Sequence, residues 1–340
     1  MTAKPEEQPL DAATAGMSAA LPRADRRQAG VAQQVLNKAM EYSVVVALVL
    51  LVIVARILYP NFLAVQNIRE IFSQNAELAL VALGVTYCLI AGVFDLSVGS
   101  TAGLGALAAA AVSGHGIVVA FLAAIVVGAA AGSVNAFVVT KMNVNAFIAT
   151  LGTQTVFLGA ATLYSTAPIT VSNAGMLNMG FGNTFGIPTT VLIAGVIFLI
   201  AGFILSRTVY GRVLYIVGGN TEAARLAGLR VWMARGSVFL VSGVCAALAG
   251  LLLVTVVGNG QAGYGADYTL DAYAMVVVGG TSLFGGEGAI WRTVAGVLII
   301  AITNDLFNSL AWPGAAQDIV IGGILILAVA LDAFARARRT

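Results

Sequence analysis

The stretch SRTVYGRVLYIVGGNTEAARLAGLRVWMAR, residues 206–235, decides the arrangement of this chain, because it is a charged island between two long apolar segments. It contains five of the seventeen basic residues. Such clustering of Arg between apolar segments is typical of a cytosolic loop in a membrane protein. The sequence therefore predicts a cytosolic loop over residues 207–235, with membrane segments on both sides of it.

Five residues of this island predict a short helix inside the loop. Gly218 and Gly219 interrupt the chain. Asn220 or Thr221 can accept hydrogen bonds from the first free amides of a helix, and glycine, here Gly228, suits the position just after a helix end. We expect an exposed helix over residues 221–227.

The composition of this short helix favours contact with another protein. Its alanines are small enough for a partner's groove to admit the helix closely: Ala223, Ala224 and Ala227. Glu222 and Arg225 lie about one turn apart and can form an ion pair. A basic connector that only sets the topology would contain the same residues, so both interpretations stay open.

Composition places the chain in a membrane. Of its 340 residues, 59% are hydrophobic and 9% are charged, whereas soluble domains have about 25% charged residues. Apolar runs close to the roughly 20 residues that cross a bilayer as a helix recur from residue 43 onward. We expect an all-α polytopic membrane protein of about ten transmembrane helices, over residues 43–59, 75–93, 97–113, 117–139, 146–166, 187–206, 235–257, 270–282, 291–310 and 316–333.

The ends of the chain are polar. Residues 1–40 have no apolar run and predict a disordered cytosolic tail, followed by a transmembrane domain over residues 41–335 and a cytosolic tail over residues 336–340. The first apolar run starts too late for a secretory signal peptide, so we expect an uncleaved anchor. Residues 75–113 contain two segments joined so tightly that one of them can be re-entrant.

The distribution of basic residues predicts how the chain is oriented in the membrane. With the N-terminus inside, the connections around Lys141, residues 207–235 and Arg292 are cytosolic, and only Arg56 and Arg69 remain on the other side. The long connections 168–188 and 258–271 then lie on the side of the membrane opposite the cytosol, where they can receive a soluble partner.

AGVFDLSVGS, residues 91–100, places Asp95 between apolar runs, where a charge costs about 2.5 to 3.5 kcal/mol on insertion scales. In one interpretation Asp95 and Ser97 cap the helix that follows a break. In the other, the same break lies beside a polar cavity through which a substrate passes, with Phe94 beside it.

NVNAFIATLGTQTVFLG, residues 143–159, places Phe147, Thr150 and Gln154 along one stripe of a helix. An aromatic ring with hydroxyl and amide partners suits a sugar, although Thr and Gln also bond helices together in membranes. Asn304, in a later apolar segment, is a second polar residue with the same two interpretations.

Residues 270–288, LDAYAMVVVGGTSLFGGEG, contain five glycines that allow a tight reversal near the cytosol. Glu287 and Arg292 follow this reversal. A partner that grips residues 207–235 can therefore also reach Glu287.

These segments together resemble the permease subunits of bacterial ABC importers of the ribose, xylose and branched-chain amino acid superfamily, and the sugar branch fits best. The match covers residues 61–332 approximately, with Phe94 and Ala146 at positions where that family usually has Ile and Pro. It implies the ABC importer permease type of fold, with interrupted helices. For the substrate pathway it implies Asp95, Ser97, Phe94, Phe147, Thr150, Gln154 and Asn304.

The resemblance also implies partners. A separate ATPase subunit docks on the 207–235 loop as on a coupling helix, through Gly219, Asn220, Glu222, Ala223, Arg225, Gly228 and Glu287. A periplasmic or lipid-anchored substrate-binding protein docks on the opposite side, and a second permease copy completes a homodimer or heterodimer. The setting it implies is the bacterial inner membrane, with both termini cytosolic.

The function that the resemblance implies is ATP-driven import of a pentose or a similar sugar or polyol by alternating access. The chain has no G-x-x-x-x-G-K-[ST] loop, so we expect ATP hydrolysis in another subunit, no cofactor or metal on this chain and no enzymatic activity. Two alternatives stay open: a permease for a branched-chain amino acid or a furanone-like signal, and an ion-coupled secondary transporter.

Overall fold

The computed structural model describes residue 42 and residues 44–337, and these are almost entirely helical. The predicted tail over residues 1–40 and residues 338–340 of the predicted C-terminal tail lie outside the described residues. The helices are Val44–Leu58, α3 (Val65–Gln74), α4 (Ala76–Ile90), α5 (Val98–Ala111), the 3-10 turn η1 (Ser113–His115), α6 (Ile117–Thr140), α7 (Ala146–Tyr164), α8 (Ala174–Phe181), α9 (Thr189–Arg207), α10 (Val209–Gly219), α11 (Thr221–Leu226), α12 (Val231–Val257), α13 (Tyr268–Val278), α14 (Ile290–Ser309) and α15 (Gly314–Ala337).

Each of the ten predicted segments coincides with one of these helices, which confirms the all-α prediction. Five described helices are long and apolar enough to cross a membrane alone, or six if α3 and α4, bent by 49°, form one span. The segment predicted over residues 270–282 ends earlier, at Val278, because Gly279 and Gly280 begin a turn there. Both α5 and α13 are shorter than a bilayer crossing and lie next to breaks, which is the geometry of interrupted helices.

Residues 207–235 are less of a loop than predicted. Helix α10 occupies most of the first half, and α12 already begins at Val231. The sequence signals for α10 are weak because its glycines, Gly211, Gly218 and Gly219, are poor helix formers.

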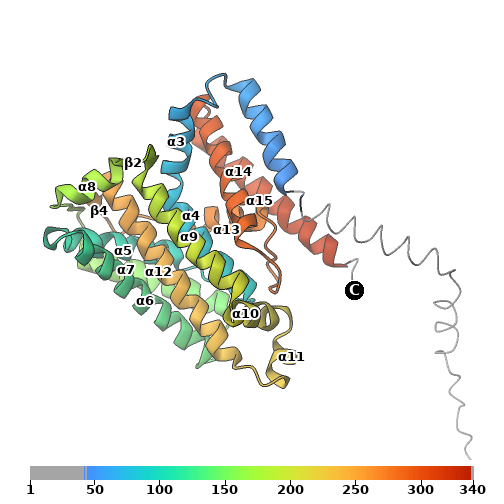
Figure 1. The fold of residues 1–340 in the computed structure, drawn as a ribbon. Coiled ribbons are helices and arrows are strands. Elements are labelled where there is room, and N and C mark those ends of the chain that lie inside the picture. Colours follow the sequence, from blue (N-terminus) through green and yellow to red (C-terminus); the bar gives the residue numbers. More distant parts are fainter. Residues whose placement is uncertain (1–41, 43, 338–340) are drawn as a thin grey trace, which may run out of the picture. The chain divides into compact units, whose positions relative to one another are not determined.

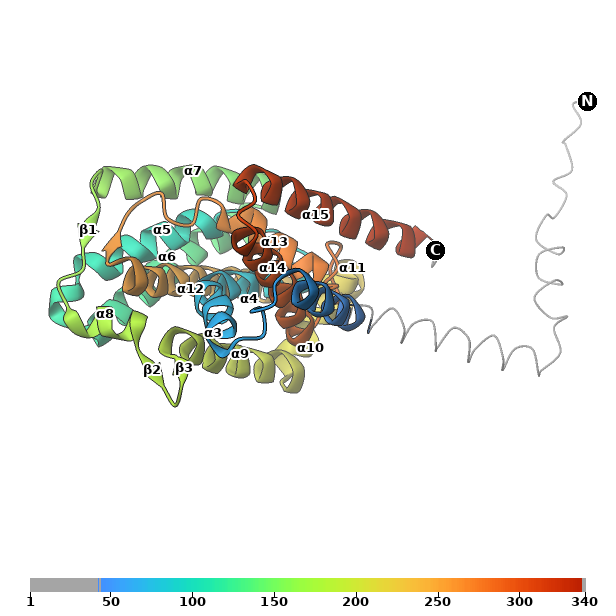
Figure 2. The ribbon, with the colours of Figure 1, turned by 90° about the horizontal axis from the view of Figure 1, so that it is seen from above.

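Helices α4 and α12 form the centre. All fifteen residues of α4 are buried, and α12 packs against α4, α5 and α6. Seen from above, α12 and α4 lie between α5 and α6 on one side and α9 on the other (Figure 2). Small residues allow this packing: a Cβ on Gly128 of α6 or on Gly243 of α12 would overlap the other residue's carbonyl oxygen.

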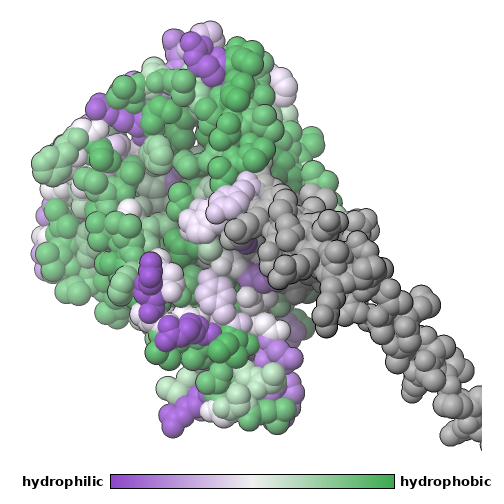
Figure 3. All heavy atoms as spheres, turned by 45° about the vertical axis from the view of Figure 1, so that its right-hand side comes forward, coloured by the Kyte–Doolittle hydropathy of each residue, from purple (hydrophilic) through white to green (hydrophobic). Residues whose placement is uncertain are grey.

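The two ends of the bundle carry different connections (Figure 1). At one end, strand β1 (Ile169–Thr170) pairs with β4 (Asn259–Gly260), so the two long connections predicted on the same side are joined. A second small pair, β2 (Asn183–Thr184) with β3 (Ile187–Pro188), lies at this end too. Helices α10 and α11 lie at the other end, with hydrophobic surface between the ends (Figure 3).

Candidate functional site

The break between α4 and α5 is the feature around which the predicted pathway residues gather. It spans residues 91–97, and Gly92 turns the chain with φ of +71°. Side chains then alternate: Asp95 and Ser97 are buried, while Phe94 and Leu96 are partly exposed. The break therefore presents one polar face inward and one apolar face outward.

Asp95 is 1% exposed, and one of its oxygens accepts three hydrogen bonds. Its Oδ1 accepts from the Ser97 backbone amide at 3.1 Å, from the Ser97 hydroxyl at 2.7 Å and from Asn135 Nδ2 at 3.3 Å. Asp95 thus accepts from the amide of Ser97, the residue before α5, but the start of α5 has no side-chain cap, so the capping interpretation stays a prediction. Ser97 makes no capping bond of its own, because its hydroxyl donates to Asp95 and accepts from Asn135 at 2.7 Å.

Three further helices hold this break in place. Thr153 of α7 donates to Asn135 Oδ1 at 2.6 Å, and Thr150 accepts from the Leu96 amide at 3.0 Å. Tyr273 of α13 accepts from the Asp95 amide at 2.8 Å. Backbone groups freed by the interruption are thus bonded to side chains of neighbouring helices, as a membrane interior requires.

Sequence reasoning missed Asn135, Thr153 and Tyr273. Each is a polar side chain in a largely apolar helix, and this polarity is the signal that points to it. Asp95, Ser97, Asn135 and Thr153 are joined by hydrogen bonds, and we call them the Asp95 cluster. The predicted stripe on α7 contained Gln154, but the residue of α7 that joins this cluster is Thr153, one position earlier.

The partly exposed face of the break is aromatic. Phe94 stacks on Tyr273 with ring centroids 6.0 Å apart and meets Phe147 edge to face at 6.4 Å. Phe147 is 50% exposed, and Gln154 of the same helix is half-buried. The structure therefore brings Phe94 and Phe147 together at an accessible surface, whereas Asp95, Ser97 and Thr150 lie behind it.

Asn304 is engaged elsewhere. Its Oδ1 accepts from Gln317 of α15 at 3.0 Å, and the adjacent Asp305 accepts from Asn67 of α3 at 3.0 Å. Both bonds join α14 to neighbouring helices, and neither involves a residue of the Asp95 cluster.

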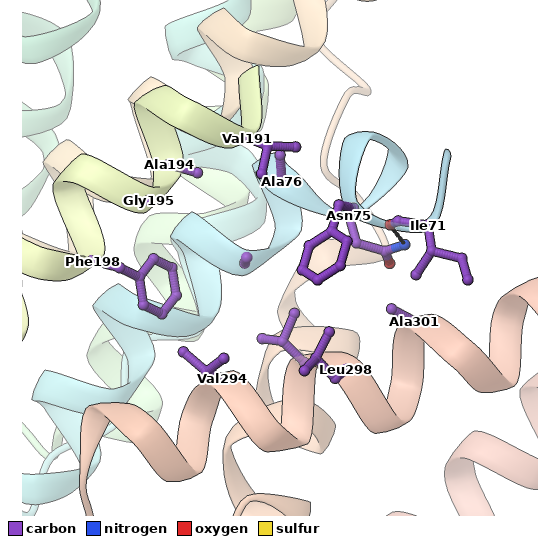
Figure 4. Close-up of a pocket in the computed structure, with 13 residues that line it drawn as sticks. Ile71, Asn75, Ala76, Val191, Ala194, Gly195, Phe198, Val294, Leu298 and Ala301 are labelled. Carbon is purple, nitrogen blue, oxygen red and sulfur yellow. Dashed lines mark hydrogen bonds between the residues drawn. The ribbon is translucent and has the colours of Figure 1, made fainter. Parts of the chain in front are cut away.

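An apolar pocket of about 170 Å³ lies between α4, α9 and α14 and the end of α3 (Figure 4). Asn75 is the only polar residue among those that line it, and its amide donates to the Ile71 carbonyl at 2.8 Å. Asn75 is thus the one side chain of this pocket that can bond a sugar, and its other walls suit hydrocarbon.

The short helix predicted over residues 221–227 is present as α11, one residue shorter than predicted. Asn220 Oδ1 accepts from the Ala223 amide at 2.9 Å, and Gly228 follows the helix with φ of +80°. Arg225 and Glu222 are paired at 2.7 Å on the exposed face. Ala224 departs from the prediction, since it is buried against its own chain and is not available to a partner.

The ion pair lowers the pKa of Glu222, chiefly through the hydrogen bond from Arg225. A lowered pKa means that the pair stabilises the helix above the ordinary pKa of glutamate, and that this contribution is lost as pH falls through the lowered value. Because both side chains are exposed, solvent screens the pair and its contribution is small.

The end of α10, immediately before α11, lies directly against the break that holds Asp95. A Cβ on Gly218 would overlap the Ile90 carbonyl oxygen at the end of α4 and would lie 2.8 Å from the Gly286 nitrogen. The Gly286 amide donates to that same Ile90 carbonyl at 2.9 Å. A Cβ on Gly285 would lie 2.7 Å from the Gly218 oxygen and 2.9 Å from Gly92 Cα. We call these five residues the glycine junction.

The predicted Glu287 follows this junction and is exposed. Its carbonyl accepts from the Ser282 amide at 3.1 Å, and the neighbouring Gly288 carbonyl accepts from the Tyr215 hydroxyl at 2.8 Å. The loop after α13 and helix α10 are therefore held together, with Glu287 on the same end of the bundle as α11.

Comparison with known proteins shows that the chain is similar to transport permeases. Residues 67–329 match the family model described as branched-chain amino acid transport system, permease component. The ribose import permease protein of Escherichia coli (strain K12) is 37% identical over 300 residues, which is 86% of this chain and 94% of the relative.

Two other relatives are permeases named for different sugars. The L-arabinose transport system permease protein of Escherichia coli (strain K12) is 34% identical over 310 residues, 88% of this chain and 93% of the relative. The D-allose transport system permease protein of the same strain is 34% identical over 275 residues, 80% of this chain and 84% of the relative. No solved structure matches the chain significantly.

Proposed function

The chain belongs to the family of branched-chain amino acid transport system permease components, and from this premise we propose that it carries a pentose or a similar sugar or polyol. It is a multi-pass membrane protein and a transport subunit of an ABC importer. The three relatives described above are named for ribose, L-arabinose and D-allose, which supports a sugar over a branched-chain amino acid or a furanone-like signal.

The glycine junction is the observation that carries the mechanism. An ATPase subunit that moves α11 also moves Gly218, and Gly218 has no free space against Ile90 and Gly286. Displacement of α11 is therefore transmitted to the end of α4 and through residues 91–97 to the Asp95 cluster. This is the mechanical connection that alternating access needs.

The sugar contacts the outward face of the break in this proposal. Phe94 and Phe147 offer aromatic surface, and Gln154 offers an amide for which no hydrogen bond is described. Asp95, Ser97 and Thr150 act as positioning residues, because their polar atoms already bond to one another or to the break. Asn304 holds α14 to α15.

A second permease copy completes the pathway. Phe147 and Gln154 lie on α7, whose residues Ile148, Leu151 and Val156 are 49% to 66% exposed. A substrate that moved along this face of a single chain would meet lipid. Covering α7 with another copy encloses the face, and this supports a dimer.

The remaining partners follow from the two ends of the bundle. The ATPase docks on α11 and near Glu287, and hydrolyses the ATP, so this chain needs no cofactor of its own. A periplasmic or lipid-anchored substrate-binding protein docks at the opposite end, where β1 pairs with β4. The charge pattern supports a bacterial inner membrane setting with both termini cytosolic.

The test is uptake by proteoliposomes that contain this chain, its ATPase and its substrate-binding protein. We expect uptake of a radiolabelled pentose that requires ATP and that a proton uncoupler does not reduce. Uptake that continues without ATP and stops with the uncoupler would instead indicate an ion-coupled transporter. ATP-driven uptake of leucine but of no sugar would keep the mechanism and change the substrate.

A further inference from the structure

A basic hollow lies beside α11, and most of its lining residues belong to the turn after α11 and the start of α12. It encloses about 460 Å³ and is lined by Arg225, Arg230, Arg235 and Trp232, together with five residues that are polar or apolar but uncharged. No lining residue is acidic. The nearest carboxylate with a described contact is Glu222, which pairs with Arg225 at the exposed edge.

A fourth cation, Lys141, lies beside this hollow and lines the neighbouring one. Its Nζ lies 3.7 Å from the centroid of the Trp232 ring, a cation–π distance. A second hollow, lined by both residues, shares Thr140 and Trp232 with the first. The cations thus come from four parts of the chain: the residue after α6, α11 itself, the turn after α11 and the start of α12.

Glu222 compensates Arg225, but no acidic residue lines the hollow beside Arg230 and Arg235. These like charges repel one another, and Arg235 is only partly satisfied. Its Nη2 donates to Thr221 at 2.7 Å, but its buried Nε has no hydrogen-bond partner among the described residues. A buried N–H without an acceptor is uncommon in folded proteins, so the hollow is complementary to an anion.

The position of the hollow identifies the kind of anion. Helices α6 and α12 are candidate membrane spans, and the hollow lies at the end of the first and the start of the second. The ends of membrane spans lie at the headgroup level, where Trp, Lys and Arg are characteristic side chains. Basic pockets between spans at this level suit lipid phosphates.

We propose that this hollow binds the phosphate of an anionic phospholipid headgroup, with Arg230, Arg235 and Lys141 as its cations and Trp232 at the interface. Apolar lining residues, among them Val139 and Val231, border the path of the acyl chains. The inference requires only that α6 and α12 span the membrane, and it does not depend on the transported substrate.

The test measures quenching of Trp232 fluorescence by brominated lipids in phosphatidylcholine vesicles. Trp291→Phe and Trp312→Phe leave Trp232 as the only tryptophan of the three. We expect brominated phosphatidylglycerol to quench more strongly than brominated phosphatidylcholine at equal fraction. Lys141→Gln with Arg230→Gln, two exposed side chains, should weaken this preference about tenfold or more.

The control is Arg207→Gln with Arg212→Gln, which removes the same charge from exposed positions outside the hollow. Unchanged quenching in this control supports the proposal, and an equal loss in both variants overturns it in favour of general surface attraction. Inorganic phosphate is the second arm: if it removes the preference for phosphatidylglycerol, the site is one for a free anion. Should the double variant fail to fold, Arg230→Gln alone is assayed by the number of phosphatidylglycerol molecules retained in native mass spectrometry.

Discussion

Asp95 is a carboxylate inside an apolar bundle, and its neighbours explain how it is accommodated. A charge at this depth costs about 2.5 to 3.5 kcal/mol on insertion scales. Donors on Ser97 and Asn135 surround one of its oxygens, and the break next to it supplies the backbone amide. The side chain therefore replaces the hydrogen bonds that the interrupted helix loses.

Substitution of Asp95 separates positioning from direct substrate contact. Asp95→Asn keeps an oxygen that can accept from the Ser97 amide, so we expect the thermal midpoint in detergent and the uptake rate to stay close to wild type. Asp95→Leu leaves the Ser97 amide and the Asn135 side chain without this acceptor, at about 1 to 3 kcal/mol each, and should lower both the midpoint and the uptake rate. Loss of uptake by Asp95→Asn with an unchanged midpoint would contradict the positioning role and favour a charge in the pathway.

Substitution of Phe147 tests whether the sugar contacts the aromatic face formed by Phe94 and Phe147. Phe147→Ala removes a half-exposed ring, so the thermal midpoint should change little, while loss of about 1 kcal/mol of aromatic contact raises the KM of uptake about fivefold. Ile148→Ala is the matched control, since Ile148 is the next residue of α7 and is 66% exposed. An equal KM for both variants would exclude Phe147 from substrate contact.

At the scale of elements, the glycine junction offers adjacent positions with opposite expectations. Gly218→Ala places a methyl group against Ile90 and Gly286, and overpacking of this kind costs about 1 to 3 kcal/mol. Gly219→Ala places it 3.9 Å from the nearest atom, Gly286 Cα, where there is room. We expect Gly218→Ala to reduce the sugar transported per ATP hydrolysed, and Gly219→Ala to leave this ratio unchanged; equal ratios would argue against the coupling route.

Helix α11 is tested by exchanging its charges. Glu222→Lys with Arg225→Glu keeps the net charge and an exposed pair worth less than about 1 kcal/mol, so the thermal midpoint should not change. Co-purification of the ATPase should weaken, because the partner now meets charges of the wrong sign. The matched exchange, Arg69→Glu with Glu70→Lys at the opposite end, should leave co-purification intact. Unchanged assembly and transport in the α11 variant would contradict the proposal that the ATPase docks on α11.

These elements also show what the sequence can predict. Helix α11 was predictable because its signals are local: a cap at Asn220, a terminating Gly228 and a pair one turn apart. The glycine junction was not, since Gly218 meets Gly286 across 68 positions of chain and only the packing of α10 on α4 brings them together. Ala224 was assigned to the wrong face for the same reason: a six-residue helix has no periodicity that distinguishes inside from outside.

At the scale of the whole molecule, the ten apolar segments were predictable and their pairing was not. Length and hydropathy locate the helices, but they do not indicate that α4 is buried on all sides while α7 is largely exposed. Small residues on α5, α6 and α12 would allow many close pairs. Which pair forms depends on three-dimensional complementarity, such as that of Gly128 with Gly243.

The exposed face of α7 leads to the last prediction, which concerns assembly. Nothing lies within 4 Å of a Cβ built on Gly152, so a side chain there is accommodated in the single chain. If a second copy covers α7, Gly152→Cys should form a disulfide-linked dimer in the membrane under mild oxidation. The described native cysteines, Cys88 and Cys245, are buried and should not interfere.

Leu199→Cys, on α9 at 75% exposure, is the control and should remain a monomer on a non-reducing gel. Dimerisation of the control alone would place the second copy on α9 and would leave Phe147 facing lipid. In that case the aromatic face of the break could not be the enclosed sugar pathway, and the pathway would have to pass through another part of the bundle. The cross-link therefore tests the assembly and the substrate face together.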